Sequence, residues 1–204
     1  MDPLMDDSGL DSGLWVPTTP APIVPVPAAQ VASLRGRRVI TGDPERGWHD
    51  GLRADETVEQ NGQRLVPVLG EYDYYRAELD QIEVFAPLVP LDQVWVEQPA
   101  PTSAPQLADQ EPGDLLSRLV SLTTPPVRRP VPARDASGIT GRRVVVVSPN
   151  REKRDVRAAS EPYQVADGTI CLRLCGEPNW FRWAFTGTPP PRTIETPIYL
   201  VWVE

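Results

Sequence analysis

Short apolar segments of strand type, not helical stripes, dominate the hydrophobic pattern of the chain. Residues 143–147 form a β-branched run, and residues 64–69 and 169–175 alternate and each stop at a glycine. Such runs are typical of short strands separated by turns. Further strands are expected at residues 38–40, 74–79, 94–97, 180–185 and 201–204.

This pattern occurs twice along the chain, in residues 34–97 and 138–204. Both segments open with Gly-Arg-Arg-Val, close with Val-Trp-Val-Glu and share an interior block that begins with Gly-Glu and ends with Arg. The recurrence in one order predicts an internal duplication. The interior blocks are Gly70–Arg76 and Gly176–Arg182.

Each repeat is expected to hold four or five short strands and to end in a strand after a proline-containing loop. At the level of the fold this resembles an SH3-like barrel, and the Tudor-type and KOW-type barrels are the nearest comparison. The predicted fold class is mostly β, with two tandem small SH3-like β-barrels joined by a proline-rich linker.

The segments outside the repeats are rich in proline. Residues 1–33 are also acidic, and we expect them, like most of residues 98–137, to be extended and disordered. A short helix is expected at 114–122, where Leu115, Leu116, Leu119 and Val120 share one helical face. The predicted organisation is 1–33 (disordered), 34–97 (barrel), 98–137 (linker) and 138–204 (barrel).

Composition narrows the function classes. The 204 residues include 25 prolines and 14 glycines, which excludes a long helical bundle, and the net charge of −8 excludes a polybasic chain that binds nucleic acid or membranes as a whole. An acidic start without basic residues is unlike a secretory signal, so the expected location is cytoplasmic. Seven arginines against thirteen acidic residues make the first repeat acidic, whereas the second is slightly basic. The two repeats are therefore expected to meet different partners.

No residue pattern favours catalysis, a metal or a cofactor. Cys171 and Cys175 are expected to pack in a core, because leucines occupy the matching positions of the first repeat. His49, the single histidine, is expected in a solvated loop. Glu71 and Glu177 recur in both repeats, and a tight turn is favoured there over acid–base chemistry. The glutamates that close the repeats are interpreted as solvent-facing strand ends.

The strand expected after that turn carries the candidate binding residues. Alternation would place residues 75, 77 and 79 in the core and turn an aromatic and an arginine outward in each repeat. Aromatic and arginine side chains are enriched at binding hot spots. The alternative is that this face packs against another strand or the linker. The candidate ligand-binding residues are Tyr74, Arg76, Trp180 and Arg182.

These features predict a non-catalytic binding or adaptor protein that engages a protein or peptide partner. One alternative is a nucleic-acid-associated regulator that contacts DNA or RNA through the basic second repeat. Further alternatives are a phage structural component and an enzyme with its site between the barrels. The nucleic-acid candidates are Arg142, Arg143, Arg151, Lys153, Arg154 and Arg157.

Overall fold

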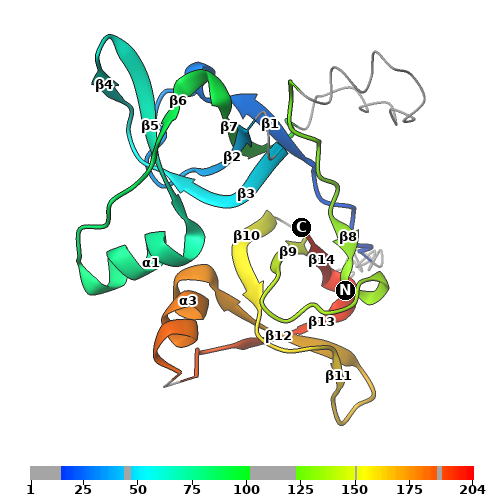
Figure 1. Cartoon of the computed structure of the whole chain (residues 1–204). Helices are drawn as coiled ribbons and strands as arrows, with labels where there is room; N and C mark the ends of the chain where they lie inside the picture. The colour runs from blue at the N-terminus through cyan, green and yellow to red at the C-terminus, as the bar shows by residue number, and fades with distance from the viewer. Residues whose placement is uncertain (1–14, 44–46, 102–122, 150, 188–189) are drawn as a thin grey trace, which may run out of the picture.

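Two antiparallel curled sheets and two helices make up a mostly β structure (Figure 1). The computed structural model describes residues 15–43, 47–101, 123–149, 151–187 and 190–204. The helix expected at 114–122 lies outside the described residues.

The first half of the structure runs from the first to the seventh strand. Its helix follows directly on its fifth strand, and a 3₁₀ turn follows the first strand and precedes the last. The elements are β1 (Ile23–Pro27), η1 (Ala28–Gln30), β2 (Arg38–Asp43), β3 (Gly47–Ala54), β4 (Val58–Gln60), β5 (Gln63–Gly70), α1 (Glu71–Asp80), β6 (Leu88–Pro90), η2 (Leu91–Gln93) and β7 (Val94–Pro99).

The second half repeats the same order of elements. Its helix and its second and third strands are as long as those of the first half, its first and last strands are shorter, and the 3₁₀ turns lie at matching places. The elements are β8 (Val131–Pro132), η3 (Ala133–Asp135), β9 (Arg143–Ser148), β10 (Arg151–Ala158), β11 (Tyr163–Gln164), β12 (Ile170–Gly176), α3 (Glu177–Thr186), β13 (Ile194–Pro197), η4 (Ile198–Leu200) and β14 (Val201–Val203).

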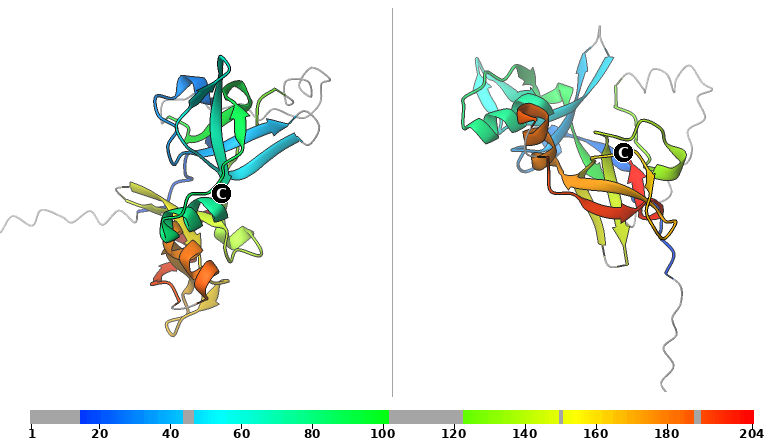
Figure 2. Two further views of the ribbon diagram at one scale, coloured as in Figure 1. Left: turned by 60° about the vertical axis from the view of Figure 1, so that its left-hand side comes forward. Right: turned by 90° about the horizontal axis from the view of Figure 1, so that it is seen from below.

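Each sheet is a half-barrel of seven strands with one strand order. In the first half the order is β1-β7-β2-β3-β5-β4, with β6 paired to β5, and in the second it is β8-β14-β9-β10-β12-β11, with β13 paired to β12. In both halves the pairing register shifts between the second and third strands, that is, between β2 and β3 and between β9 and β10. Figure 2 shows from two further directions that the sheets remain distinct and that the helices lie where they meet.

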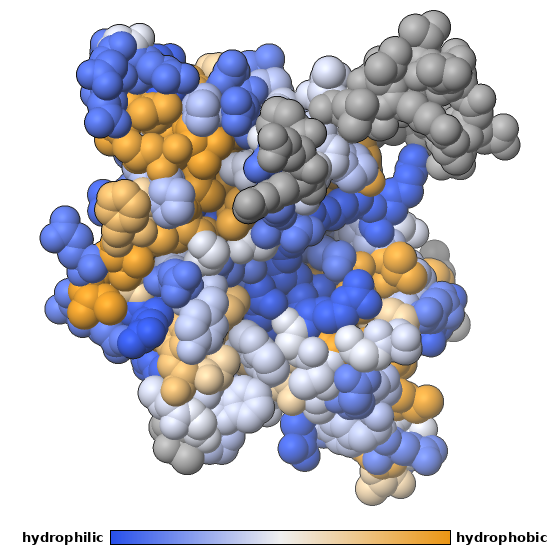
Figure 3. All heavy atoms as spheres, viewed as in Figure 1, coloured by the Kyte–Doolittle hydropathy of each residue, from blue (hydrophilic) through white to orange (hydrophobic). Residues whose placement is uncertain are grey.

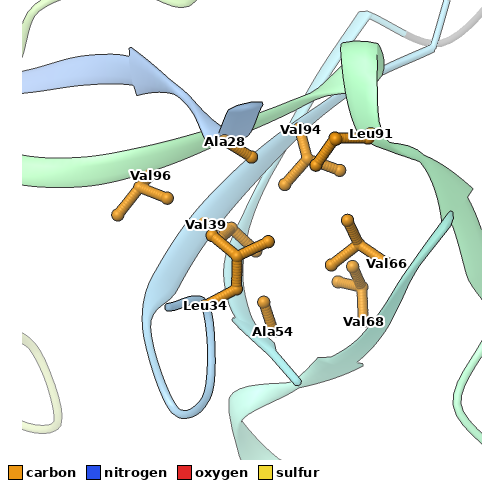
Figure 4. Close-up of a cluster of buried hydrophobic side chains, with 9 residues drawn as sticks. All are labelled: Ala28, Leu34, Val39, Ala54, Val66, Val68, Leu91, Val94 and Val96. Atoms are coloured by element: carbon orange, nitrogen blue, oxygen red, sulfur yellow. The ribbon is translucent and has the colours of Figure 1, made fainter. Parts of the chain in front are cut away.

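The core of each half includes residues upstream of the predicted repeat. Ala28 packs with Leu34, Val39, Val66 and other buried side chains of the first half (Figure 4). Ala133 plays the same part in the second half. A Pro-Val-Pro-Ala sequence, at residues 25–28 and 130–133, leads into both cores.

The expectation of disorder is therefore wrong for parts of both proline-rich segments. Strand β1 pairs along its length with β7, and β8 pairs with β14. Both are edge strands, where proline is tolerated because one side of the strand needs no hydrogen-bond donor. Because these segments are rich in proline, the sequence did not indicate that each contains a strand that completes a sheet.

The strands expected at residues 74–79 and 180–185 are also wrong, because these residues belong to α1 and α3. The residues buried in these helices are Glu71 and Tyr75 in one and Glu177 and Phe181 in the other. A spacing of four places each pair on one helical face. Since half of that face is glutamate, the hydrophobic pattern showed no helical stripe.

The first turns explain why both segments are helical. Each helix begins directly after a glycine with extended dihedral angles, and glutamate is its first residue. A negative charge at a helix N-terminus interacts favourably with the helix dipole. Pro178 at the start of α3 suits the first turn, where its missing N–H is no loss. The tight-turn interpretation of Glu71 and Glu177 is thereby replaced.

Candidate functional site

Eight buried or nearly buried charged side chains lie where the two halves meet. We call them the interface cluster, and every one has a counterpart of the same type in the other half. The cluster consists of Arg38, Arg53, Glu71 and Glu97 from the first half and Arg143, Arg157, Glu177 and Glu204 from the second.

Glu177 is the most enclosed member of the interface cluster, with an exposed fraction of 0%. Its Oε2 accepts hydrogen bonds from Arg53 Nη2 at 2.6 Å and Arg38 Nη2 at 2.8 Å, both from the other half. Arg157 of its own half donates from Nε to Oε1 at 3.0 Å. The Tyr75 hydroxyl accepts from Arg53 at 3.0 Å and donates to Glu177 at 3.1 Å. This carboxylate thus binds three guanidinium groups, and two of them, Arg38 and Arg53, join it to the other half.

Glu71 makes the reciprocal contact from the first half. Its Oε2 lies 2.6 Å from Arg157 Nη2, which matches the distance between Glu177 and Arg53. Its Oε1 lies 3.5 Å from Arg53 Nε and 3.7 Å from Arg38 Nε, and none of these three atoms has a hydrogen-bond partner among the described residues. The two halves exchange equivalent contacts, as the subunits of a two-fold dimer do.

Aromatic rings extend this contact between α1 and α3. Tyr75 stacks on Phe181 with ring centroids 4.7 Å apart, and Tyr72 meets Phe185 edge-on at 4.3 Å. Each guanidinium partner also lies over a ring, Arg53 over Tyr75 and Arg157 over Phe181. Ring contact and ion pairs together place α1 beside α3, as Figure 1 shows.

The closing glutamates of the repeats are not solvent-facing, so that interpretation is wrong. The side chains of Glu97 and Glu204 are only 5% exposed. Glu97 binds Arg143 at 3.0 Å, across the halves, and Glu204 binds Arg154 at 2.6 Å within its own half. The end of each half-barrel therefore packs against the junction.

The segment before β1 also crosses between the halves. Ala21 donates its backbone N–H to Glu152 and accepts a hydrogen bond from Arg154. Two residues later, Ile23 exchanges backbone hydrogen bonds with Arg128 at 2.8 and 3.0 Å. These hydrogen bonds join the segment before β1, and the first residue of β1, to residues of the second half and of the segment before β8.

Burial and charge act in opposite directions on Glu177. Burial by itself would raise the pKa of its carboxyl, but Arg38, Arg53 and Arg157 hold that pKa below the usual value of 4.5. Burial, followed by the charge of Glu177, raises the pKa of Tyr75 well above its usual value of 10.0. At neutral pH Glu177 is therefore an anion and Tyr75 a neutral donor.

This depressed pKa predicts a loss of stability in acid. The unfolded chain binds a proton at Glu177 at higher pH than the folded chain does, so acid favours unfolding. The free energy of unfolding is expected to fall as the pH drops below about 4.5, the ordinary pKa of glutamate. Urea unfolding followed by tryptophan fluorescence between about pH 3 and pH 7 measures this. A free energy of unfolding that is flat over this range would contradict it.

The six basic residues predicted for nucleic acid divide into two sets. Arg143, Arg154 and Arg157 are 12–14% exposed and bind carboxylates of the junction. Arg142, Arg151 and Lys153 are exposed. The structure does not bring the six together as one basic surface, because three of them neutralise carboxylates.

Of the four predicted ligand-binding residues, Tyr74 lines a groove. The groove has a volume of about 280 Å³ and lies between α1, β5 and the segment after α1. Its apolar walls come from Pro67, Leu69, Tyr74, Ala77, Ile82 and Val84, and its acidic residues are Asp55, Glu78 and Glu83. Sequence reasoning found Tyr74 but missed Ile82, which it placed in no element.

The other three predicted residues lie away from this groove. Arg76 is exposed and pairs with Asp80 one helical turn later, at 3.7 Å. Trp180 packs over Gly141 of its own half, where a Cβ would lie 3.0 Å from the ring, and Arg182 is exposed. On a helix, residues two apart point in different directions, so the expected aromatic–arginine pairs do not form.

Apolar side chains remain exposed beside the groove. Phe85 is 90% exposed, and Ile82, Leu88 and Val58 are each 41–47% exposed. Figure 3 shows hydrophobic residues gathered on this side of the first half and hydrophilic residues gathered between the halves. We call these four residues and the groove the apolar face.

The cysteines and the histidine show no arrangement for nucleophilic chemistry. Both cysteines are free and buried in β12, as expected from the leucines at the matching positions. Burial raises the pKa of Cys175 to about 11 and also raises that of Cys171. His49 lies exposed on β3, beside Asp50, which binds Arg128 at 2.5 Å. At neutral pH neither thiol is a thiolate.

One sequence signal could have revealed the interface cluster. Charged positions recur with the same sign in both repeats, and two of the recurring arginines and two of the recurring glutamates belong to the cluster. Reciprocal ion pairs across a two-fold contact give a physical reason for such a recurrence. This recurrence indicates which residue types form the cluster, but it does not indicate that their partners lie in the other half.

The two described helices have ten residues each, and neither has the length and apolar character needed to cross a membrane. Compared with known proteins, the chain matches no protein family, no curated protein and no solved structure.

Proposed function

We propose that this chain is a non-catalytic binding protein whose first half engages an apolar segment of a protein partner through the apolar face. The observation that carries the proposal is the nearly complete exposure of Phe85 beside a groove with apolar walls. Contiguous exposed apolar surface on a folded domain marks interaction sites, because its exposure to water costs free energy that a partner recovers.

The charges around the groove indicate the chemistry of the partner. Asp55, Glu78 and Glu83 line it, and the one arginine there, Arg53, is already bound to Glu177. A segment that combines one or two apolar side chains with lysine or arginine fits this surface. Electrostatic complementarity of this kind adds specificity and speeds association.

A peptide selection tests the proposal. A displayed library of random peptides is selected on the full chain, and the enriched peptides are labelled for fluorescence anisotropy. The enriched sequences are expected to pair apolar with basic residues. Substituting Phe85→Ser together with Ile82→Ser is expected to weaken their binding at least about tenfold, as loss of hot-spot side chains does.

The matched control is Ile194→Ser in the second half. Ile194 is 62% exposed, so its replacement removes a comparable apolar side chain away from the groove. Equal binding by the double variant and the control would refute the proposed site. Enrichment of acidic peptides, whose negative charge resembles that of a phosphate backbone, would favour the nucleic-acid alternative.

We further infer that the two halves derive from an internal duplication of an SH3-like barrel. The equal element order, the equal strand order and the 3₁₀ turn directly before β7 and β14 support this. Conservation of the interface cluster in both halves fits an ancestor that paired with a second copy of itself. A cytoplasmic location belongs to the same proposal and rests on composition.

A further inference from the structure

A second cavity, which shares Arg53 with the groove, lies at the junction of the halves. Its volume is about 310 Å³, and it is lined by residues from both sheets. Figure 3 shows the hydrophilic area between the halves in which it lies. Its charged residues are six arginines (Arg37, Arg38, Arg53, Arg128, Arg143 and Arg154) and three acids (Glu97, Asp155 and Glu204).

The arginines that line this cavity outnumber the carboxylates that line it, also after the pairs with the buried Glu71 and Glu177 are subtracted. Arg53 and Arg157 neutralise Glu177 and Glu71, which they contact at 2.6 Å each. The remaining five arginines of the cavity then face three carboxylates. Two positive charges are left over in a chain whose net charge is −8.

Two acidic residues outside the cavity equal this excess in number, but both are more exposed than the arginines that they bind. Asp50 binds Arg128 and Glu152 binds Arg154, but their side chains are 59% and 35% exposed. Solvent and salt screen exposed charges far more than buried ones. Within the cavity, Asp155 is 69% exposed, whereas its partner Arg38 is 11% exposed. The buried side of the junction therefore remains positive.

The arginines keep their charge. Burial by itself would lower the pKa of Arg38, but Glu177, Asp155 and Glu204 raise it above its usual value. The same balance, with Glu97 and Glu71 as the acidic neighbours, raises the pKa of Arg143. Guanidinium groups also present several N–H donors in a plane, a geometry that matches the oxygens of a phosphate group.

We propose that this cavity, which we call the junction cavity, binds a small dianion that carries a phosphate group. Among the junction side chains that are at most 14% exposed, five arginines face four glutamates, and Arg37 and Arg128 add two guanidinium groups to the cavity wall. The volume stands at the lower end of the range of ligand pockets, about 300–1,000 Å³, which suits a small molecule. The junction cavity and the groove share Arg53, but Arg37 and Arg128 line the junction cavity and do not line the groove.

Arg37 is the residue that tests the proposal without disturbing the junction. It is exposed, lines the junction cavity and makes no ion pair with any described residue, so Arg37→Ala leaves the interface cluster intact. Its counterpart in the second half, Arg142, is also exposed but does not line the junction cavity. Arg142→Ala is therefore a control that removes the same charge from the equivalent turn.

Isothermal titration calorimetry of the full chain with inorganic phosphate and with glycerol 3-phosphate, at constant ionic strength, measures binding. Both probes are expected to bind saturably, with acetate much weaker. Arg37→Ala is expected to raise the Kd about tenfold or more through loss of a charge-assisted hydrogen bond, and Arg142→Ala to leave it unchanged. Tighter binding of glycerol 3-phosphate than of phosphate would identify the ligand as a small phosphomonoester.

Three results would overturn the proposal. One is the absence of saturable binding of either probe. Another is an equal Kd for Arg37→Ala and Arg142→Ala. The third is binding of a single-stranded oligonucleotide without binding of the small probes, which would indicate a nucleic-acid surface instead. Because none of these measurements involves the apolar face, failure here leaves the peptide-binding proposal untouched.

Discussion

Replacing Glu177 by glutamine is expected to lower the free energy of unfolding by about 3–5 kcal/mol, as removal of one partner from a buried ion pair does. Glu177 has no exposed surface and accepts hydrogen bonds from Arg38, Arg53 and Arg157. Glutamine keeps the shape of the side chain but removes its charge. Three guanidinium groups then lose a counter-ion that water cannot replace.

Urea unfolding of the full chain, followed by tryptophan fluorescence, measures this loss. Glu59→Gln on β4 is the matched control, because Glu59 is exposed. Substitutions at such surface positions change stability by less than about 0.5 kcal/mol. If Glu177→Gln unfolds within about 1 kcal/mol of the wild type, the halves do not depend on this carboxylate as the structure implies.

Replacing Ala28 by aspartate is expected to destabilise the first half by about 3 kcal/mol or more. Ala28 is 2% exposed and packs in the core with Leu34 and Val39. An aspartate there has no partner, so burial either leaves a charge without solvent or forces the carboxyl to bind a proton. If residues 1–33 were wholly disordered, the same substitution would have almost no effect.

Two matched variants define the comparison for Ala28→Asp. Ala32→Asp introduces the same charge four residues later at an exposed position, and we expect it to be neutral. Ala133→Asp places aspartate at the corresponding buried position of the second half, and we expect a similar loss there. Thermal unfolding followed by circular dichroism measures all three, and equal melting temperatures for Ala28→Asp and Ala32→Asp would contradict the strand assignment around β1.

The strands with a strong local pattern could be predicted, because their sequence and their burial agree. The valine run of β9 lies between β10 and β14 and is buried on both faces, so it reads as continuous apolar sequence. Strands β5 and β12 end at glycines, where the expected boundary lies within one or two residues of the observed one. Alternation and β-branching are local properties that need no knowledge of the partner strand.

The two helices could not be predicted in this way, since a charged residue occupies their buried face. Glu71 and Glu177 are buried only because arginines of the other half neutralise them. Without that partner a glutamate at the start of a segment indicates a turn or a solvent-facing end. The same reasoning explains the error at Glu97 and Glu204.

By itself, the sequence determined that the protein is mostly β, where six of the fourteen described strands lie and which charged positions recur. These follow from local periodicity and from comparison of the chain with itself. Tertiary structure alone decided that β1 and β8 complete the sheets, that α1 and α3 are helices and that the interface cluster is buried. Each of these depends on groups brought from the other half or from a distant strand, and the free energy of burying a charge is set by the partner it meets.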